Sequence, residues 1–168
     1  MVEDESRVDE FLQKLEELDS MYVEVGILSS VGGEMLTIAS VQEFGADITV
    51  TDKMRGYMAA NFGVHLKQST TSIKIPERSF IRSSFDAKQE QIYEQEELLA
   101  MVLEGQITAR GFYEMLGQTC VDIIKDYLIN EVNSPANSSL TKSIKGSSNP
   151  LVDTGKLVNS ITYQIKKG

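Results

Sequence analysis

His65 and Cys120 are the residues of this sequence that most directly suggest catalysis. A histidine beside a thiol or a serine hydroxyl can remove its proton and so generate a nucleophile. The 168 residues contain one histidine and one cysteine, and no Gly-x-Ser-x-Gly pentapeptide or other local nucleophile motif. Cys120 also falls on the apolar stripe of an expected helix, where cysteine packs as a small apolar residue. We therefore expect His65 at the surface, Cys120 in the core, and no catalytic residues.

Acidic side chains could in principle bind a divalent cation or transfer protons, and Glu94, Glu96 and Glu97 are clustered. Such chemistry needs carboxylates that converge in a cleft, whereas these three are expected on the polar face of a helix. A single cysteine excludes an internal disulfide and any multi-cysteine metal site. Gly32-Gly33 lacks the spacing of a phosphate-binding loop. The sequence therefore predicts no metal site and no cofactor.

Two short stretches combine residue types in a way that packing of a hydrophobic core alone does not require. In residues 75–82 a strand is stopped by proline and followed by Arg78, Phe80 and Arg82. If a helix starts at Ser79, the two arginines share a face and can bind a carboxylate of a neighbouring molecule. The second stretch covers residues 149–161. The candidate residues for a subunit or partner interface are Arg78, Phe80, Arg82, Leu140, Ile144, Asp153 and Thr154.

The elements that position these residues follow from apolar periodicity and capping signals. Met35, Ala39 and Phe44 indicate one face of a short helix, and Phe112, Leu116, Cys120, Ile123 and Tyr127 indicate the inner stripe of a long one. Thr51 and Thr108 are expected N-caps. The expected helices are 6–19, 34–44, 51–61, one from Ser79 or Asp86 to Leu103, and 109–132. The expected strands are 22–28, 48–50, 72–75 and 160–165.

These elements predict an α+β fold with a small, mostly antiparallel sheet of three to five strands packed by two long helices. Residues 1–20 form an acidic N-terminal helix, 21–132 the body, and 151–168 a turn and strand that complete it. Residues 133–150 hold six Ser, three Asn and two Pro, with Leu140 and Ile144 isolated among them. We expect this Ser/Asn-rich segment to be a mobile loop that reaches a neighbour or orders on assembly.

The formal net charge of −9 argues against general binding to duplex nucleic acid, which needs clustered basic residues. No stretch is apolar enough for a membrane span, and the acidic N-terminus does not resemble a signal peptide. The charge is also segmented. Residues 51–82 carry six bases against two acids, whereas residues 1–20 carry eight acids against two bases. Such blocks can pair head to tail between copies, or they can be solvated faces of one fold.

Four motifs in order resemble the tail-completion or neck proteins of tailed bacteriophages, also known as minor tail components or virion-morphogenesis proteins. Together they span residues 22–165, with residues 53–67 similar to an insertion found in some members. The motifs are Val23-Glu24-Val25-Gly26-Ile27, Glu43-Phe44-Gly45, Ile75-Pro76-Glu77-Arg78-Ser79-Phe80-Ile81-Arg82, and Pro150-Leu151-Val152-Asp153-Thr154-Gly155-Lys156-Leu157 followed by Ser160-Ile161.

The resemblance implies a structural virion protein of the neck or head-proximal tail, assembled in the host cytoplasm as a ring that is six-fold by analogy with tail symmetry. Its implied partners are copies of itself, a head-connector or stopper protein, and a tail terminator or tail tube protein. Genome DNA would pass through the lumen without specific binding, since an acidic lumen repels phosphates. No membrane, cofactor or enzymatic activity is implied.

Two other functions stay open at this point. The first is a tail assembly chaperone that is absent from the mature virion. The second is a phage-encoded hydrolase that uses Cys120 or His65.

Overall fold

The computed structural model of the protein describes residues 2–132 and 155–168. These residues form seven α-helices, one 3-10 helix and four β-strands, which confirms the predicted α+β class. In chain order the elements are α1 Val2–Asp19, β1 Met21–Gly26, the 3-10 helix η1 Ser29–Val31, α2 Gly33–Phe44, β2 Ala46–Thr49, α3 Asp52–Phe62, β3 Ser72–Ile75, α4 Ile81–Tyr93, α5 Glu96–Leu103, α6 Ala109–Asn130, α8 Lys156–Asn159 and β4 Thr162–Lys167.

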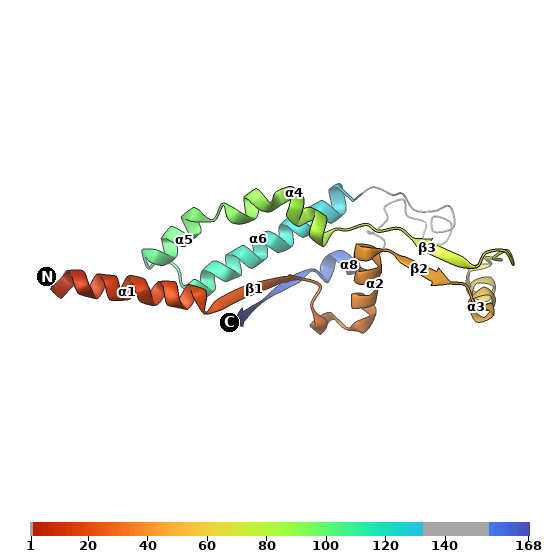
Figure 1. Ribbon diagram of the computed structural model, residues 1–168, viewed down its shortest axis with the longest axis horizontal. Coiled ribbons are helices and arrows are strands. Elements are labelled where there is room, and N and C mark those ends of the chain that lie inside the picture. Colours follow the sequence, from red (N-terminus) through yellow and green to blue (C-terminus); the bar gives the residue numbers. More distant parts are fainter. Residues whose placement is uncertain (1, 133–154) are drawn as a thin grey trace.

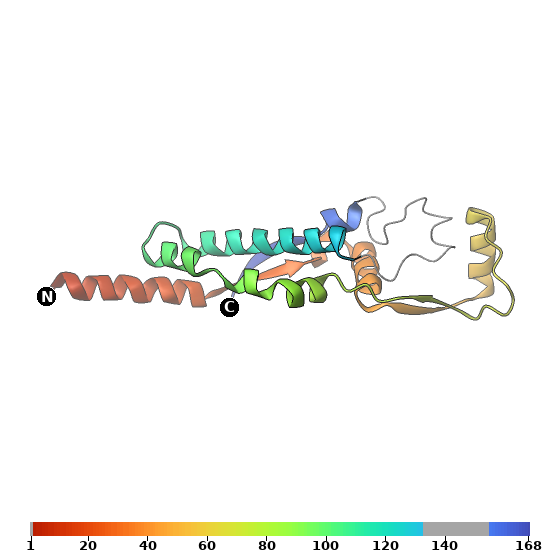
Figure 2. The ribbon, with the colours of Figure 1, turned by 90° about the horizontal axis from the view of Figure 1, so that it is seen from above.

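The molecule is elongated, with a helical body in the middle and one element projecting from each end (Figure 1). α1 projects at one end. At the other end, β2 and β3 leave the body as a ribbon that carries α3 at its tip, and α3 stands across the ribbon (Figure 2). We call residues 46–75, which comprise β2, α3, β3 and their connections, the β-arm.

The strands divide between two antiparallel sheets of two strands each. β1 pairs with β4 in the body, with Met21 opposite Lys167 and Gly26 opposite Thr162. β2 pairs with β3 in the β-arm. The antiparallel pairing agrees with the sequence prediction, but the described strands do not join into one sheet. α2 and the turn at Gly45 direct β2 away from the body, so it cannot lie beside β1.

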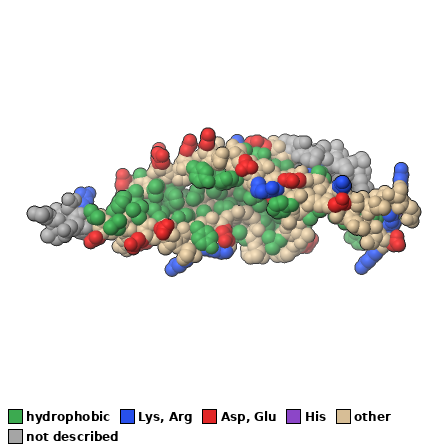
Figure 3. All heavy atoms as spheres, viewed as in Figure 1, with side chains coloured by type: hydrophobic (Ala, Val, Ile, Leu, Met, Phe, Trp, Pro, Cys, Tyr) green, Lys and Arg blue, Asp and Glu red, His purple; other side chains and the backbone are tan. Residues whose placement is uncertain are grey.

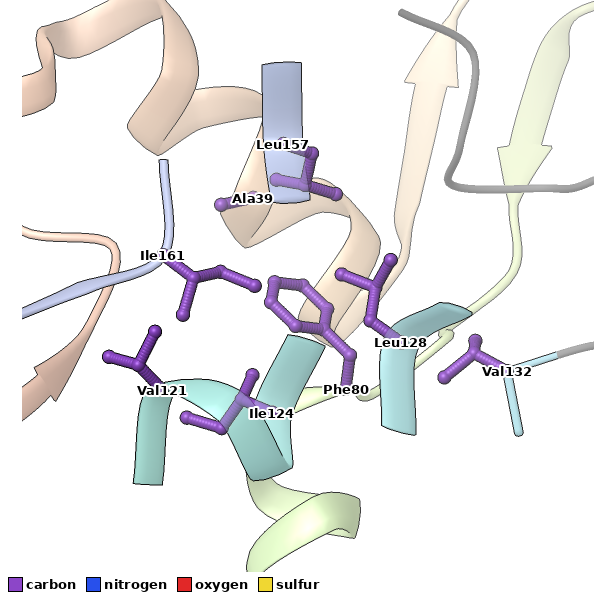
Figure 4. Packing of buried hydrophobic residues seen from close by; sticks show 8 residues of the cluster. All are labelled: Ala39, Phe80, Val121, Ile124, Leu128, Val132, Leu157 and Ile161. Atoms are coloured by element: carbon purple, nitrogen blue, oxygen red, sulfur yellow. The ribbon is translucent and has the colours of Figure 1, made fainter. Parts of the chain in front are cut away.

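Phe80 is the centre of the main hydrophobic core and is fully buried. Its ring is surrounded by side chains from α2, α6 and the C-terminal region (Figure 4). The buried residues of this cluster are Ala39, Phe80, Val121, Ile124, Leu128, Val132, Leu157 and Ile161. The core therefore joins segments between residues 39 and 161 around one aromatic ring.

The buried face of α6 differs from the stripe expected at Phe112, Leu116, Cys120, Ile123 and Tyr127. Its buried residues are Ala109, Gly117, Val121, Ile124 and Leu128. The last four each lie one position after an expected residue, which corresponds to a rotation of about 100°. Gly117 explains the error, because a residue without a side chain does not contribute to an apolar pattern. It faces β1 and β4, where an added Cβ would lie 2.5 Å from Tyr163 Cδ2.

The helix expected from Ser79 or Asp86 to Leu103 is two helices, α4 and α5, separated by Glu94 and Gln95. Neither glycine nor proline marks the break, so the sequence gives no signal for it. Of the apolar side chains in this stretch, Val102 is buried and Ile92 half-buried, whereas Phe85 and Leu99 are exposed. The break directs α5 toward α1, where Val102 packs with Leu18 and Ala109 in a second, smaller core.

Several local predictions are confirmed. Thr51 Oγ1 accepts a hydrogen bond from Met54 N at the start of α3, and Thr108 Oγ1 accepts one from Gly111 N at the start of α6. The helix expected at residues 51–61 is α3, and Gly63 follows its last residue in the left-handed conformation, with φ of 64°. The strand expected at residues 72–75 is β3. In each case the signal is local, so no tertiary contact is needed to recognise it.

Part of the prediction lies outside the described residues, namely the Ser/Asn-rich segment 133–150 and the turn that follows it to residue 154. Within residues 2–132 and 155–168, no helix combines the length and the apolar character that crossing a membrane requires.

Replacing Gly117 with alanine should lower the free energy of unfolding by about 1–3 kcal/mol. The new Cβ would lie 2.5 Å from Tyr163 Cδ2 and 3.0 Å from Val23 Cγ2, so α6 would have to move away from the sheet. Urea unfolding followed by circular dichroism measures the change. Gly56→Ala in α3 is the control, because its added Cβ meets no atom within 4 Å. Equal stability of the Gly117→Ala and wild-type proteins would contradict this close approach of helix and sheet.

Candidate assembly surface

The Glu43 side chain, at the end of α2, is buried and caps the start of α4. Its Oε2 atom accepts hydrogen bonds from Phe80 N at 2.8 Å and Ile81 N at 3.0 Å, and its Oε1 atom from Arg82 N at 3.1 Å. The Ser79 hydroxyl donates a further bond of 2.8 Å to Oε1. The first N–H groups of a helix need acceptors and favour a negative charge. A carboxylate from another helix supplies both here.

Arg82 closes the same contact from the solvent side. Its Nε atom donates to Glu43 Oε1 at 3.1 Å, and Nη2 donates to the backbone oxygen of Glu43 at 2.9 Å and to Glu77 Oε1 at 2.8 Å. The guanidinium lies 4.7 Å from the centre of the exposed Phe44 ring, a cation–π contact. The Arg82 side chain is still 52% exposed. It therefore binds carboxylates of its own chain while presenting a cation and an aromatic ring at the surface.

The charge state of Glu43 follows from these bonds. Burial by itself raises the pKa of the Glu43 carboxyl, but the donors from Ile81, Arg82, Ser79 and Phe80 outweigh it, so the pKa lies below the ordinary value of 4.5. The hydrogen bond to Glu43 in turn raises the pKa of Arg82 above that of an ordinary arginine. Both groups are charged at neutral pH.

Two of the predicted interface residues are not at the surface. Phe80 lies in the core, and Arg78 is buried beside α2, where its N–H donates to Gln42 O at 2.8 Å and Nη1 contacts Gln42 Oε1 at 3.4 Å. α4 begins at Ile81, not at Ser79. Arg78 and Arg82 therefore do not form the expected pair on one helix face, because Arg78 precedes the helix. Leu140, Ile144, Asp153 and Thr154 lie outside the described residues.

Gly45 brings the two ends of the β-arm together at this contact. Its φ is 72°, and an added Cβ would lie 2.9 Å from Glu77 N and 3.0 Å from Ile75 O. The chain enters the β-arm at Ala46, three residues after Glu43, and leaves it at Ile75, seven residues before Arg82. The motif at residues 43–45 and the motif at residues 75–82, 30 positions apart in the sequence, therefore form one clamp at the base of the β-arm.

Glu43 is the central residue that sequence reasoning missed, since Phe44 was expected on the inner face of α2. Met35 and Ala39 do lie against the main core, but the third residue of that face is Glu43, and Phe44 is exposed. The spacing of four from Met35 to Ala39 to Glu43 was the available signal. A carboxylate on an apolar helix face needs a donor elsewhere in the fold.

The candidates for catalysis are not brought together. His65 is exposed in the β-arm, while Cys120 lines a hollow of about 290 Å³ between β1, α4 and α6 in the body. The hollow is mainly apolar, and burial raises the pKa of the Cys120 thiol. The thiol is therefore less ionised at neutral pH than an ordinary cysteine, opposite to what a nucleophile requires. Glu94, Glu96 and Glu97 are exposed, and within the described ranges no three potential ligands are grouped to hold a metal ion.

Comparison of the chain with protein-family models, with curated proteins and with solved structures gives no match. The motif resemblance to phage tail-completion proteins therefore stays a prediction.

Replacing Glu43 with glutamine should lower the free energy of unfolding by about 1–3 kcal/mol at neutral pH, since a neutral amide cannot accept all five hydrogen bonds that the carboxylate accepts. Because the folded-state pKa of Glu43 is lowered, its contribution is complete above the unfolded value of 4.5 and is lost as the pH falls through the folded-state pKa. The difference between wild type and Glu43→Gln should therefore shrink below pH 4.5. Urea unfolding over a pH series measures it.

The matched control is Glu77→Gln, which removes an exposed carboxylate that also binds Arg82. An exposed ion pair contributes about 1 kcal/mol at most, so this variant should stay close to wild type. A Glu43→Gln deficit that is constant with pH would show that the Glu43 charge does not stabilise α4.

Proposed function

We propose that this protein is a structural component of a tailed-bacteriophage virion, a ring-forming tail-completion or neck protein at the head–tail junction, without enzymatic activity. The proposal combines the motif resemblance over residues 22–165 with one structural observation. That observation is a β-arm that projects from the body and is clamped at its base by Glu43, Gly45 and Arg82.

The β-arm has the properties of an element that is completed by a neighbour. Its sheet has only two strands, and such an isolated ribbon is marginally stable. None of the residues of α3, all of which the structure describes, is buried. An isolated helix of 11 residues is short for independent stability in water. Contact with a second subunit would bury surface that the chain leaves exposed.

The clamp at the base meets one requirement of a ring, a fixed direction of the β-arm. A head-to-tail contact closes into a ring only if each subunit is rotated by a fixed angle relative to the last. The direction of the β-arm is set where its two ends meet the body, by the close approach of Gly45 to residues 75–77 and by the bonds of Arg82 to Glu43 and Glu77. We take the ring as six-fold, by analogy with tail symmetry.

The proposed neighbours are a head-connector or stopper protein on one side and a tail terminator or tail tube protein on the other. The net charge of −9 suits a passage for DNA that must move without being held, since acidic surfaces repel phosphates.

Virions labelled with antibody against this protein should carry the label at the head–tail junction in electron micrographs. Deletion of its gene should leave full heads and tails that do not join. Label on the capsid shell or on the distal tail would contradict the proposed position.

Mass spectrometry of purified particles separates this function from that of an assembly chaperone. A structural component should be present in the mature particle at a ring-like copy number, whereas a chaperone would be absent. As a control for chemistry, Cys120→Ala and His65→Ala should leave the yield of infectious particles at the wild-type level.

A further inference from the structure

α1 carries an apolar stripe that the fold of the chain does not use. Val8, Phe11, Leu12 and Leu15 repeat at spacings of three and four, and all four are exposed, Val8 to 54%. Leu18 alone is buried among the side chains described for this helix, residues 7–19. A surface helix normally turns such a stripe toward a partner. The part of α1 that precedes Leu18 therefore has an apolar face available for a partner.

A cleft lies beside this stripe, where α1 passes α5. Its volume is about 550 Å³, and Val8, Phe11 and Leu103 contribute its apolar wall. Lys14 fixes the two helices at the cleft, since its Nζ donates to Leu103 O at 3.1 Å and pairs with Glu10 at 2.8 Å. The stripe and the cleft together form one surface, which we call the α1 surface.

The opposite end of the molecule presents aromatic rings. Tyr57 and Phe62 of α3 form an edge-to-face pair with centroids 5.9 Å apart, and they are 58% and 46% exposed. The helix that carries them is held in place by Arg55, whose guanidinium donates to the backbone oxygens of Lys67 at 2.6 Å and Thr70 at 2.7 Å. Aromatic side chains are frequent anchors of protein interfaces.

The two ends are also opposite in charge. Residues 7–19 hold five acids and two bases, and one of these bases, Lys14, is already paired. The β-arm holds four bases and two acids, and one of these bases, Arg55, is already paired with Asp52. In Figure 3 basic side chains mark the end with the β-arm, while acidic side chains border the hydrophobic area that runs from α1 over the body. Opposite charges at facing surfaces favour the contact and set its orientation.

We propose that α3 of one copy docks on the α1 surface of the next copy, with Tyr57 and Phe62 against the apolar stripe and cleft and with Lys53 and Lys67 facing the acids of α1. This deepens the proposed function, on which it rests, by naming the contact between subunits. The two surfaces are different and lie at opposite ends of the molecule, so the contact is head to tail and repeats from copy to copy.

Two double variants test this contact. The α1 variant carries Phe11→Ser and Leu12→Ser, and the α3 variant carries Tyr57→Ser and Phe62→Ser. Both change only exposed residues, so both should keep the wild-type circular dichroism spectrum. In sedimentation velocity the wild type should assemble, and each variant alone should be monomeric. An equimolar mixture of the two variants should form a dimer and nothing larger, because it restores one good α1–α3 contact and leaves the other two surfaces damaged.

The control is Tyr93→Ser with Ile129→Ser, two exposed apolar residues of α4 and α6, and it should assemble like the wild type. Several outcomes overturn the proposal. The α3 variant alone would dimerise if α1 paired with α1, and the α1 variant alone would dimerise if α3 paired with α3. A wild type that is monomeric at every concentration, or a mixture that stays monomeric, also overturns it.

Carbodiimide cross-linking of mixed isotope-labelled and unlabelled wild-type protein gives a second readout that needs no variant. The expected intermolecular links join the acids of α1 to Lys53 or Lys67, and links confined to other pairs contradict the docking. The test is separate from that of the proposed function. If the protein is found at the head–tail junction but the mixed variants stay monomeric, only the docking is disproved. If the mixed variants dimerise but the protein is absent from purified particles, only the proposed function is disproved.

Discussion

The carboxylate of Glu43 is the contact on which the rest of this structure depends. It lies on the inner face of α2, yet it accepts the first N–H groups of α4, a helix that starts 38 residues later. This single group therefore fixes the end of α2, the start of α4 and both ends of the β-arm between them. It also positions Phe80, because it accepts a hydrogen bond from the backbone N–H of this residue, whose ring fills the main core. The capping of α4, the position of Phe80 in the core and the direction of the β-arm all depend on the Glu43 carboxylate.

The clamp and the core differ in what they require. Cores such as the one around Phe80 generally tolerate apolar substitutions of similar volume, because the hydrophobic effect is non-directional. The clamp is directional, since two carboxylate oxygens must meet donors from Ser79, Phe80, Ile81 and Arg82 at hydrogen-bond distance. A change there would alter where the β-arm points as well as how stable the body is. The proposed contact between copies depends on this direction, because it determines where α3 meets the next molecule.

Local signals in the sequence were sufficient for much of the fold and failed at particular residues. Thr51, Thr108 and Gly63 mark helix ends through their own side chains or conformation, and β3 is recognisable from its alternation. The inner face of α6 was misjudged because Gly117 contributes close approach instead of apolar surface. The role of Glu43 was missed because its partners come from a distant segment. The break between α4 and α5 carries no sequence signal, and the burial of Arg78 and Phe80 depends on contacts with α2 and α6 that periodicity alone cannot specify.

The pairing of β1 with β4 has a consequence for how the chain folds. Gln164 Nε2 donates to Glu24 Oε2 at 2.6 Å across this sheet, between residues 140 positions apart. Bringing residues so far apart in the sequence together costs loop-closure entropy before any contact across the sheet compensates for it, so such contacts form slowly. During synthesis β1 has no partner strand until residues 162–167 have left the ribosome. α6, which packs against β1, is complete by then, so we expect it to shield the waiting strand and to serve as the template on which β4 closes the body.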